Sequence, residues 1–332
     1  MYAVHLGTGH TLQCKSIKSG TIKMYCLNVA TFVSLFDPQR RDPRYATPSS
    51  KTMAFPLTKV FLEFARWEVM PNRREPYSLA MQACLHELAK SQPPDTIAPV
   101  LRNWFLTMLQ AASRQGEWAQ SLGRYKLTKP DLNFKGATMA FTLANVQFML
   151  VGKRRCSILH ALANRRVVAH YELEWDTQKN GMNGESKLFS RNHDRPDLDC
   201  VDAMLTIVDR FVRLIGCNDT TTPLAIFKPS ANSEPLLVTS REIKTIMQQL
   251  AIQVYGFRPE VDQDKLLIAR FTGHSLRVGM AVLLQAMGFS AHDIKMLCRW
   301  KSDAFMDYLR NLVYVTERVN QAWTDASAIP SL

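Results

Sequence analysis

Apolar positions recur at helical spacing along most of the chain. Two such stripes fall within the first 70 residues, and Thr21 is a candidate cap for the first of them. The segment MPNRREP (residues 70–76) follows, in which two prolines enclose two arginines, and this pattern predicts a linker. We therefore expect a small helical domain over residues 1–71 and a larger domain over residues 72–332.

The pattern of the larger domain is helical, then β-like, then helical again. Ser78 is a candidate start of a helix, and a second apolar stripe runs from Leu101 to Met108. The β-rich runs NVQFMLVG and VVAHYELEW follow, and NGMNG (residues 180–184) holds two Asn-Gly pairs, a strong hairpin signal. Helical spacing returns at Val201 and from Arg241 onward. The sequence therefore predicts a mostly α fold of the α+β class with a small antiparallel sheet.

Charge narrows the class of partner. The chain of 332 residues carries 41 Lys and Arg against 29 Asp and Glu, a net charge of +12 that favours a polyanion, most simply nucleic acid. Its seven cysteines form no CxxC pair, as in proteins of a reducing compartment. The N-terminus lacks a signal-peptide profile, and no apolar run is long enough to cross a bilayer. We expect an intracellular protein, nuclear or cytoplasmic depending on the host, without a membrane partner.

Two pairs of residues could bind or position a phosphate. In FTGHSLRVG, His274 and Arg277 share one face at the start of a helix, where the helix dipole favours an anion and a guanidinium can bind phosphate with two hydrogen bonds. In SRQGEWAQ, Arg114 lies three residues before Glu117, whose carboxylate can hold a buried arginine in position. Lys179, beside the Asn-Gly turn, could reach from the hairpin into a groove.

The last recognisable segment is FSAHDIKMLCRWKSDAFMDYLR (residues 289–310). Ser290 and Asp293 have the spacing of a capping box, which predicts a short helix, and the aromatic residues Trp300 and Tyr308 follow it. Either aromatic could equally be a core residue. The acidic run NHDRPDLDCVD is typical of a polar loop with a cap for the next helix rather than of a metal cluster, so we expect no metal and no cofactor.

The order of these residues resembles that of the tyrosine recombinase (phage integrase) family. GHSLRVG resembles the family's HxLRh box. SRQGEWAQ resembles its TGLRxSE box, with Gly116 where serine is usual. CRWKSDAFMDY resembles its GHxS…Y box, with Trp300 where histidine is commonest. The segment QKNGMNGES is similar to integrase-like sequences of eukaryotic mobile elements.

The resemblance implies a site-specific DNA recombinase or integrase with the tyrosine recombinase catalytic fold. In such an enzyme Tyr308 would attack a DNA phosphate and form a 3′-phosphotyrosine without a metal. The remaining residues would have the following roles: Arg114, Arg277 and Trp300 would bind the nonbridging oxygens, His274 would bind the phosphate or act as a base, Lys179 would protonate the leaving oxygen, and Glu117 would orient Arg114.

The resemblance also implies the assembly. Residues 1–71 would form the helical domain that binds core DNA, and residues 72–332 would form the catalytic domain. The two domains would clamp double-stranded DNA. Four protomers would assemble on paired DNA sites, with the residues after Tyr308 docked on a neighbouring protomer.

The sequence leaves several assignments open. The interval from Trp300 to Tyr308 is one residue shorter than usual, so Tyr314 is a rival nucleophile. In GKRRCSILHAL, Arg155 is a rival to Arg114, but Ile158 stands where the glutamate would be. A DNA-binding regulator without catalysis is compatible with LLQAMGFSAHDIKML, which has helix-turn-helix spacing. An inactive domesticated recombinase is also compatible with the sequence, as is an activity like that of a type IB topoisomerase.

Overall fold

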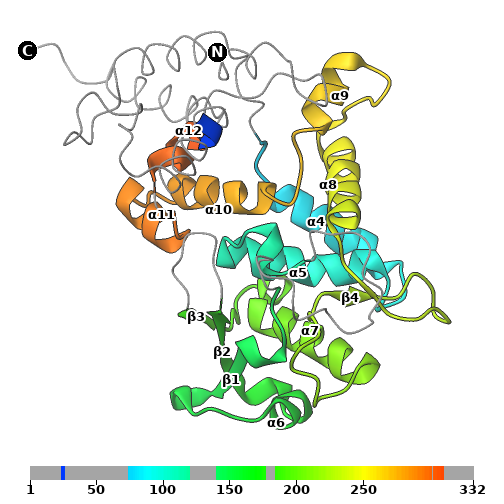
Figure 1. Cartoon of the computed structure of the whole chain (residues 1–332), viewed down its shortest axis with the longest axis vertical. Coiled ribbons are helices and arrows are strands. Elements are labelled where there is room, and N and C mark those ends of the chain that lie inside the picture. Colours follow the sequence, from blue (N-terminus) through cyan, green and yellow to red (C-terminus); the bar gives the residue numbers. More distant parts are fainter. Residues whose placement is uncertain (1–23, 27–73, 120–139, 177–183, 301, 310–332) are drawn as a thin grey trace, which may run out of the picture. The chain divides into compact units, whose positions relative to one another are not determined.

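The chain divides into two compact units, Met1–Asn72 and Arg73–Leu332. The structure, a computed structural model, describes residues 24–26, 74–119, 140–176, 184–300 and 302–309. Every element named below belongs to the second unit (Figure 1). The helices expected in the first 70 residues lie almost wholly outside the described residues, so the roles assigned to the two domains stay predictions.

The second unit is mainly helical with a small antiparallel sheet, which confirms the predicted fold class. Its helices are α4 (Leu79–Lys90), α5 (Ile97–Ala111), α6 (Ile158–Ala163), α7 (Cys200–Leu214), α8 (Ser240–Tyr255), α9 (Asp262–Ile268), α10 (Ser275–Ala286), α11 (Ala291–Leu297) and α12 (Met306–Leu309). Its strands are β1 (Val146–Leu150), β2 (Val168–Trp175), β3 (Glu185–Ser190), β4 (Ile226–Phe227) and β5 (Leu236–Leu237).

Helix α5 is the centre of the core. The predicted stripe of Leu101, Trp104, Phe105 and Met108 is fully buried. The helix is apolar on nearly all sides, as expected of a helix enclosed by others, and it packs against α4, α7, α8 and α10. Trp118, just beyond its end, stacks on Trp104 with ring centroids 5.3 Å apart. Helix α5 ends at Ala111, where Ala112 adopts the left-handed conformation, and that end forms one side of the candidate site.

The three-stranded sheet has the order β1-β2-β3, with both pairs antiparallel. Alternation along β2 buries Tyr171 and Trp175, and Tyr171 stacks on Phe189 of β3 at 4.7 Å between ring centroids. The predicted hairpin is present, because β2 and β3 pair in register as far as Trp175 opposite Glu185. Its tip, residues 177–183, lies outside the described residues and includes Lys179.

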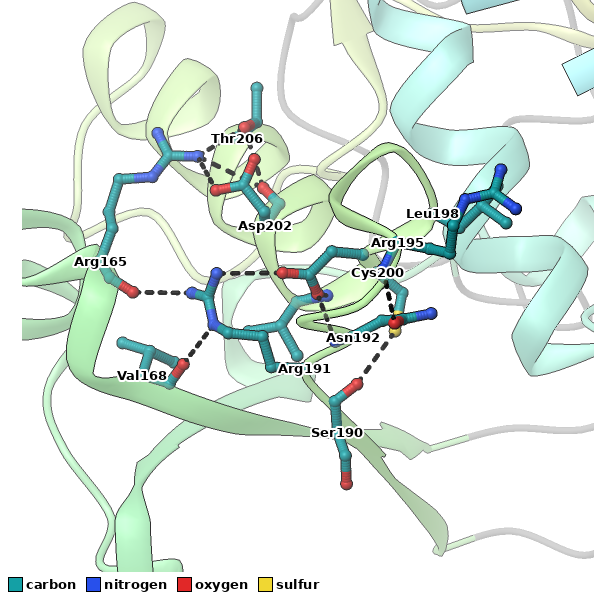
Figure 2. A network of polar contacts seen from close by, with 12 residues as sticks. Arg165, Val168, Ser190, Arg191, Asn192, Arg195, Leu198, Cys200, Asp202 and Thr206 are labelled. Atoms are coloured by element: carbon teal, nitrogen blue, oxygen red, sulfur yellow. Dashed lines mark hydrogen bonds and ion pairs between the residues drawn. The ribbon is translucent and has the colours of Figure 1, made fainter. Parts of the chain in front are cut away.

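Arg191, which follows β3, joins the sheet to helix α7 (Figure 2). Its guanidinium donates to the carbonyls of Val168 at 2.8 Å and Arg165 at 2.7 Å, and to the carboxylate of Asp199 at 3.0 Å. Asp199 also caps α7 by accepting from the N–H of Val201, as the sequence predicts. These bonds hold the hairpin against the helical core, so the strands can carry side chains to the site at their far end.

Helices α10 and α11 form a second, smaller core with α12. The capping box of Ser290 and Asp293 starts α11 as predicted. The helical spacing of Met280, Leu283, Leu284 and Met287 predicts an apolar stripe on α10, and this prediction is wrong in part. Leu284 is buried, but Met287 is 65% exposed, because α10 ends at Ala286. The buried face of the helix includes Arg277 instead.

Within the part of the chain that the structure describes, we find no helix with both the length and the apolar character needed to cross a membrane.

Candidate active site

Four segments meet at the start of α10. They are the turn after α5, the first turn of α10, the residues after α11, and α12. These segments carry six of the seven predicted site residues: Arg114, Glu117, His274, Arg277, Trp300 and Tyr308. The seventh, Lys179, lies outside the described residues.

Arg277 is the most deeply buried cation of this group, with 1% of its surface exposed. Its Nη1 donates to the carbonyl of Ala112 at 2.7 Å, and its Nη2 donates to the carbonyl of Arg299 at 2.8 Å. The guanidinium also lies over the ring of Trp300, 4.6 Å from the centroid. Among the described residues, these two carbonyls are the hydrogen-bond acceptors of the Arg277 side chain, so its charge meets no carboxylate in a direct ion pair.

The two carbonyls that hold Arg277 belong to residues in the left-handed region. Ala112 follows α5 with φ of 48°, and Arg299 follows α11 with φ of 54°. The carbonyls near a helix C-terminus carry the negative end of the helix dipole. Two helix ends therefore stabilise the Arg277 cation without neutralising it.

Burial lowers the pKa of Arg277 to about 9, and the neighbouring charges of Arg114 and Arg299 contribute to that decrease. The group is still protonated at neutral pH. A buried cation among other cations is unfavourable until an anion joins it. The surroundings of Arg277 thus favour a bound anion.

Arg114 lies in the turn between α5 and the short 3₁₀ helix Gln115–Glu117. Its Nη1 is 2.8 Å from Oε1 of Glu117, and its backbone N–H donates to Oε2 at 3.0 Å. Glu117 is 1% exposed. The expected contact between Glu117 and Arg114 is therefore present, while the catalytic roles of both residues stay predictions.

The expectation of a buried arginine at this position is wrong. The Arg114 side chain is 26% exposed, because it extends from a turn beyond the end of α5. The arginine buried against Glu117 is Arg299, whose side chain is 2% exposed and whose Nη2 is 3.0 Å from Oε2 of Glu117. Burial alone would raise the pKa of Glu117, but the charge of Arg299 and the hydrogen bonds from Arg114 and Arg299 hold it below its usual value.

Sequence reasoning missed two cations beside the site, Arg299 and Lys187. Nζ of Lys187, on β3, donates to the carbonyls of Gln110 at 3.1 Å and Leu297 at 3.4 Å. These carbonyls lie at the ends of α5 and α11, the same two helix ends that Arg277 joins. Burial lowers the pKa of Lys187. The only signal in the sequence was the position of Arg299 directly before Trp300.

His274 stands at the N-terminus of α10, in a turn where Ser275 N–H donates to the carbonyl of Thr272 at 2.8 Å. The turn packs closely on the segment of Arg114, because a Cβ at Gly273 would collide with the side chain of Gln115. The imidazole lies edge-on to Trp300 and Tyr308, with centroids 6.2 Å and 5.8 Å away.

The imidazole of His274 is neutral at physiological pH. Burial lowers its pKa to about 4, and the charges of Arg277, Arg74 and Arg114 act in the same direction. A neutral imidazole can accept a proton from a hydroxyl or donate one hydrogen bond to a phosphate oxygen.

Trp300 and Tyr308 complete the group. The Nε1 of Trp300 is buried and has no hydrogen-bond acceptor among the described residues. Its ring lies 6.1 Å from that of Tyr308, between centroids. Tyr308 is half-buried on α12, and its neighbours Phe305 and Leu309 anchor that helix in the smaller core. An indole N–H can only donate, so this one is available to an anionic oxygen.

The rival residues are placed differently. The Arg155 side chain is 70% exposed and lies 3.4 Å from the carboxylate of Glu172 on β2. This ion pair ties Arg155 to the sheet rather than to the residues around Arg277. Tyr314 lies outside the described residues.

No protein-family model matches the chain, and no curated protein matches it. Among solved structures, it is similar to the Tn1549 transposon integrase in complex with transposon right end DNA, at 11% identity and a TM-score of 0.42 over 92% of this chain and 79% of that one. It is also similar to that integrase in complex with circular intermediate DNA, at 10% identity and a TM-score of 0.41 over 93% and 81%. XerA recombinase matches at 16% identity and a TM-score of 0.38 over 100% and 99%. We base the proposed function on the side chains of the site rather than on these similarities.

The low pKa of His274 gives a prediction for the free protein. If neutral His274 serves the reaction, activity should persist well below pH 6.5, because at pH 5 a group with a pKa of about 4 is still about nine-tenths neutral. In the unfolded chain His274 has the usual histidine pKa of about 6.5, so its protonation favours the unfolded state. The folding stability linked to the neutral imidazole is therefore lost as the pH falls from about 6.5 through about 4. The measurement is the pH dependence of kcat/KM, which reports groups of the free enzyme. If kcat/KM falls with a midpoint near pH 6.5, and His274→Gln removes that midpoint, the low pKa of His274 is wrong.

Proposed function

We propose that this protein is a site-specific DNA recombinase or integrase of the tyrosine recombinase type, which cuts and rejoins DNA strands through Tyr308. The observation that carries the proposal is the surplus cation at Arg277, beside the indole donor of Trp300 and the ring of Tyr308. A phosphodiester supplies what this arrangement lacks: an anion with oxygens for both donors and a phosphorus for the tyrosine to attack.

The proposed reaction uses these groups as follows. The Tyr308 hydroxyl loses its proton and its oxygen attacks phosphorus, while the bond from phosphorus to the 5′-oxygen breaks. The product is a 3′-phosphotyrosine and a free 5′-hydroxyl, and attack by a 5′-hydroxyl reverses the step and rejoins a strand. The phosphodiester energy is kept in the protein–DNA bond, so strand exchange needs no further energy source.

Two groups would handle the protons. A phenol has a pKa of about 10, so Tyr308 needs a proton acceptor at neutral pH. Neutral His274, with its ring beside that of Tyr308, is suited to this role or to binding the phosphate. Lys179, on the tip of the hairpin, is our candidate for the proton donor to the leaving 5′-oxygen.

The transition state carries extra negative charge on the nonbridging oxygens. Arg277 and Arg114 would bind these oxygens, with Trp300 as a neutral donor, and Glu117 would orient Arg114. Preorganised donors of this kind are effective because they need no rearrangement as the charge develops. Since the guanidiniums supply positive charge at the phosphate, we expect the reaction to proceed without a metal or other cofactor.

The net charge of +12 supports double-stranded DNA as the partner. In this proposal residues 1–71 bind core DNA, residues 72–332 carry the chemistry, and four protomers assemble on paired sites. An intracellular location, nuclear or cytoplasmic, follows from the substrate.

The test is covalent capture on a nicked suicide duplex made from the DNA that flanks the gene. Cleavage releases a short fragment, so the protein stays attached and migrates as a slow band on a denaturing gel. We expect this band in excess EDTA at nearly the rate seen without it. Strict dependence on magnesium would instead indicate a nuclease-like mechanism, and the absence of a band on any flanking sequence would favour a DNA-binding regulator.

A further inference from the structure

Arg299 occupies a backbone position that normally suits glycine. It follows the end of α11. Its backbone N–H donates to the carbonyl of Met296 at 3.0 Å, and the backbone N–H of Trp300 donates to the carbonyl of Lys295 at 2.9 Å. This bonding pattern closes a helix with one left-handed residue, and Arg299 is that residue, with φ of 54°. A side chain is conformationally unfavourable there, and such strain points to a use for the side chain.

The Arg299 side chain joins parts of the site that lie far apart in sequence. Its guanidinium lies 3.8 Å from the ring centroid of Trp175 on β2 and 3.0 Å from Oε2 of Glu117. Its backbone carbonyl meanwhile accepts from Nη2 of Arg277 at 2.8 Å. A single residue therefore contacts the carboxylate that holds Arg114 and also holds Arg277 itself.

The ion pair also changes how the site is charged. Glu117 contacts two guanidiniums, those of Arg114 and Arg299, and accepts from the indole N–H of Trp175 at 3.1 Å. One negative charge is thus shared between two positive ones. If Arg299 were absent, the buried carboxylate would lose one of the two cations that keep it charged, and its hold on Arg114 would weaken.

We propose that Arg299 is a positioning residue for strand cleavage: its ion pair keeps the buried Glu117 charged, so that this carboxylate holds Arg114 toward the phosphate, and it fixes the end of α11, so that Arg277 and Trp300 hold their places. This inference rests on the proposed function. It assigns no contact between Arg299 and DNA, because the side chain is buried.

Arg299→Gly tests the side chain alone, because glycine adopts the left-handed turn and keeps the carbonyl that Arg277 uses. We expect single-turnover cleavage at saturating DNA to fall by about 10- to 100-fold, the effect of a small misplacement of catalytic groups, with the Kd for DNA within about twofold of wild type. Arg299→Lys keeps the charge but loses the planar fork, so it should lose less activity than the glycine variant. If loss of the buried charge prevents Arg299→Gly from folding, Arg299→Lys is the variant in which cleavage is measured.

The pH dependence of the cleavage rate distinguishes a positioning role of Arg299 from a general structural one. Glu117 faces Arg114 on its own turn, Trp175 from β2, Arg299 from beyond α11, and the charge of Arg277 on α10. Without Arg299, burial raises the pKa of Glu117, and protonation then releases Arg114. The acid limb of the cleavage rate should therefore move to higher pH in Arg299→Gly and move back in Arg299→Lys.

Arg195→Ala is the matched control, because it removes an exposed arginine from an ion pair with Asp197 at 2.7 Å. It should leave cleavage and its pH profile unchanged. The proposal is overturned if Arg299→Gly cleaves like wild type, or if its cleavage and DNA binding fall together with an unshifted acid limb.

A wild-type protein that forms no covalent adduct would defeat the proposed function, and the role of Arg299 would then be decided by thermal unfolding with inorganic phosphate. The role of Arg299 is supported if phosphate raises the Tm of wild type and of Arg195→Ala but does not raise the Tm of Arg299→Gly. No rise in wild type, or an equal rise in all three proteins, would overturn it.

Discussion

Tyr308→Phe is expected to abolish the covalent protein–DNA adduct while leaving DNA affinity within about twofold of wild type. Phenylalanine keeps the ring that lies against His274 and Trp300 and removes only the hydroxyl oxygen. This oxygen forms the bond to phosphorus in the proposed reaction, so the loss should be complete rather than partial. The measurement is the slow band on the nicked duplex, with binding followed separately by gel shift.

Tyr314→Phe is the matched control, since it removes the same atom from the rival tyrosine. It should leave adduct formation intact apart from a small change in rate. If Tyr314→Phe alone removes the band and Tyr308→Phe retains it, the nucleophile is Tyr314, and the ring contacts of Tyr308 are only packing.

Arg277→Ala is expected to slow single-turnover cleavage by about 10²- to 10³-fold, as for loss of one preorganised donor in an oxyanion site. The variant loses the cation that the ends of α5 and α11 hold at the proposed phosphate position. Arg277→Lys should be nearly as impaired, because one ammonium cannot replace a planar fork that spans two carbonyls. Arg114→Lys should be impaired for a similar reason, while Glu117→Gln should lose less because it disturbs only orientation.

The control for these variants is Arg155→Ala, which removes an exposed arginine that pairs with Glu172 on the sheet. It should reduce adduct formation by at most a few-fold, through weaker DNA binding. Thermal unfolding of each variant shows whether loss of rate reflects loss of fold. If Arg155→Ala is inactive while Arg277→Ala or Arg114→Ala cleaves at the wild-type rate, the phosphate binds beside the sheet and not at the proposed site.

The predictable features of this chain are those set by neighbours in sequence. The stripe of α5 appears as predicted because every third or fourth residue is apolar, and the caps of α7 and α11 appear because Asp199 and Ser290 bond to backbone within three residues. The β2–β3 hairpin is predictable in the same way, from the β-rich run VVAHYELEW followed by two Asn-Gly pairs in the sequence. His274 and Arg277 fall together because both lie on one turn of a helix.

The features that sequence did not reveal depend on contacts across long intervals. Arg277 donates to a carbonyl 165 residues away, and Lys187 donates to carbonyls 77 and 110 residues away, so no local period marks either set of contacts. Arg299 stands in a turn where its charge suggests a solvated residue, yet its ion pair reaches Glu117 across 182 residues.

The proposed covalent bond between Tyr308 and a DNA phosphate is tested most directly by identifying the modified peptide. The adduct from the nicked duplex would be digested with nuclease and protease, and the nucleotide-bearing residue would be located by mass spectrometry. We predict a nucleotide joined through its 3′-phosphate to Tyr308 in the wild-type protein, formed in EDTA. The same modification on Tyr314, or a stable nucleotide bond to any other residue, would contradict this assignment.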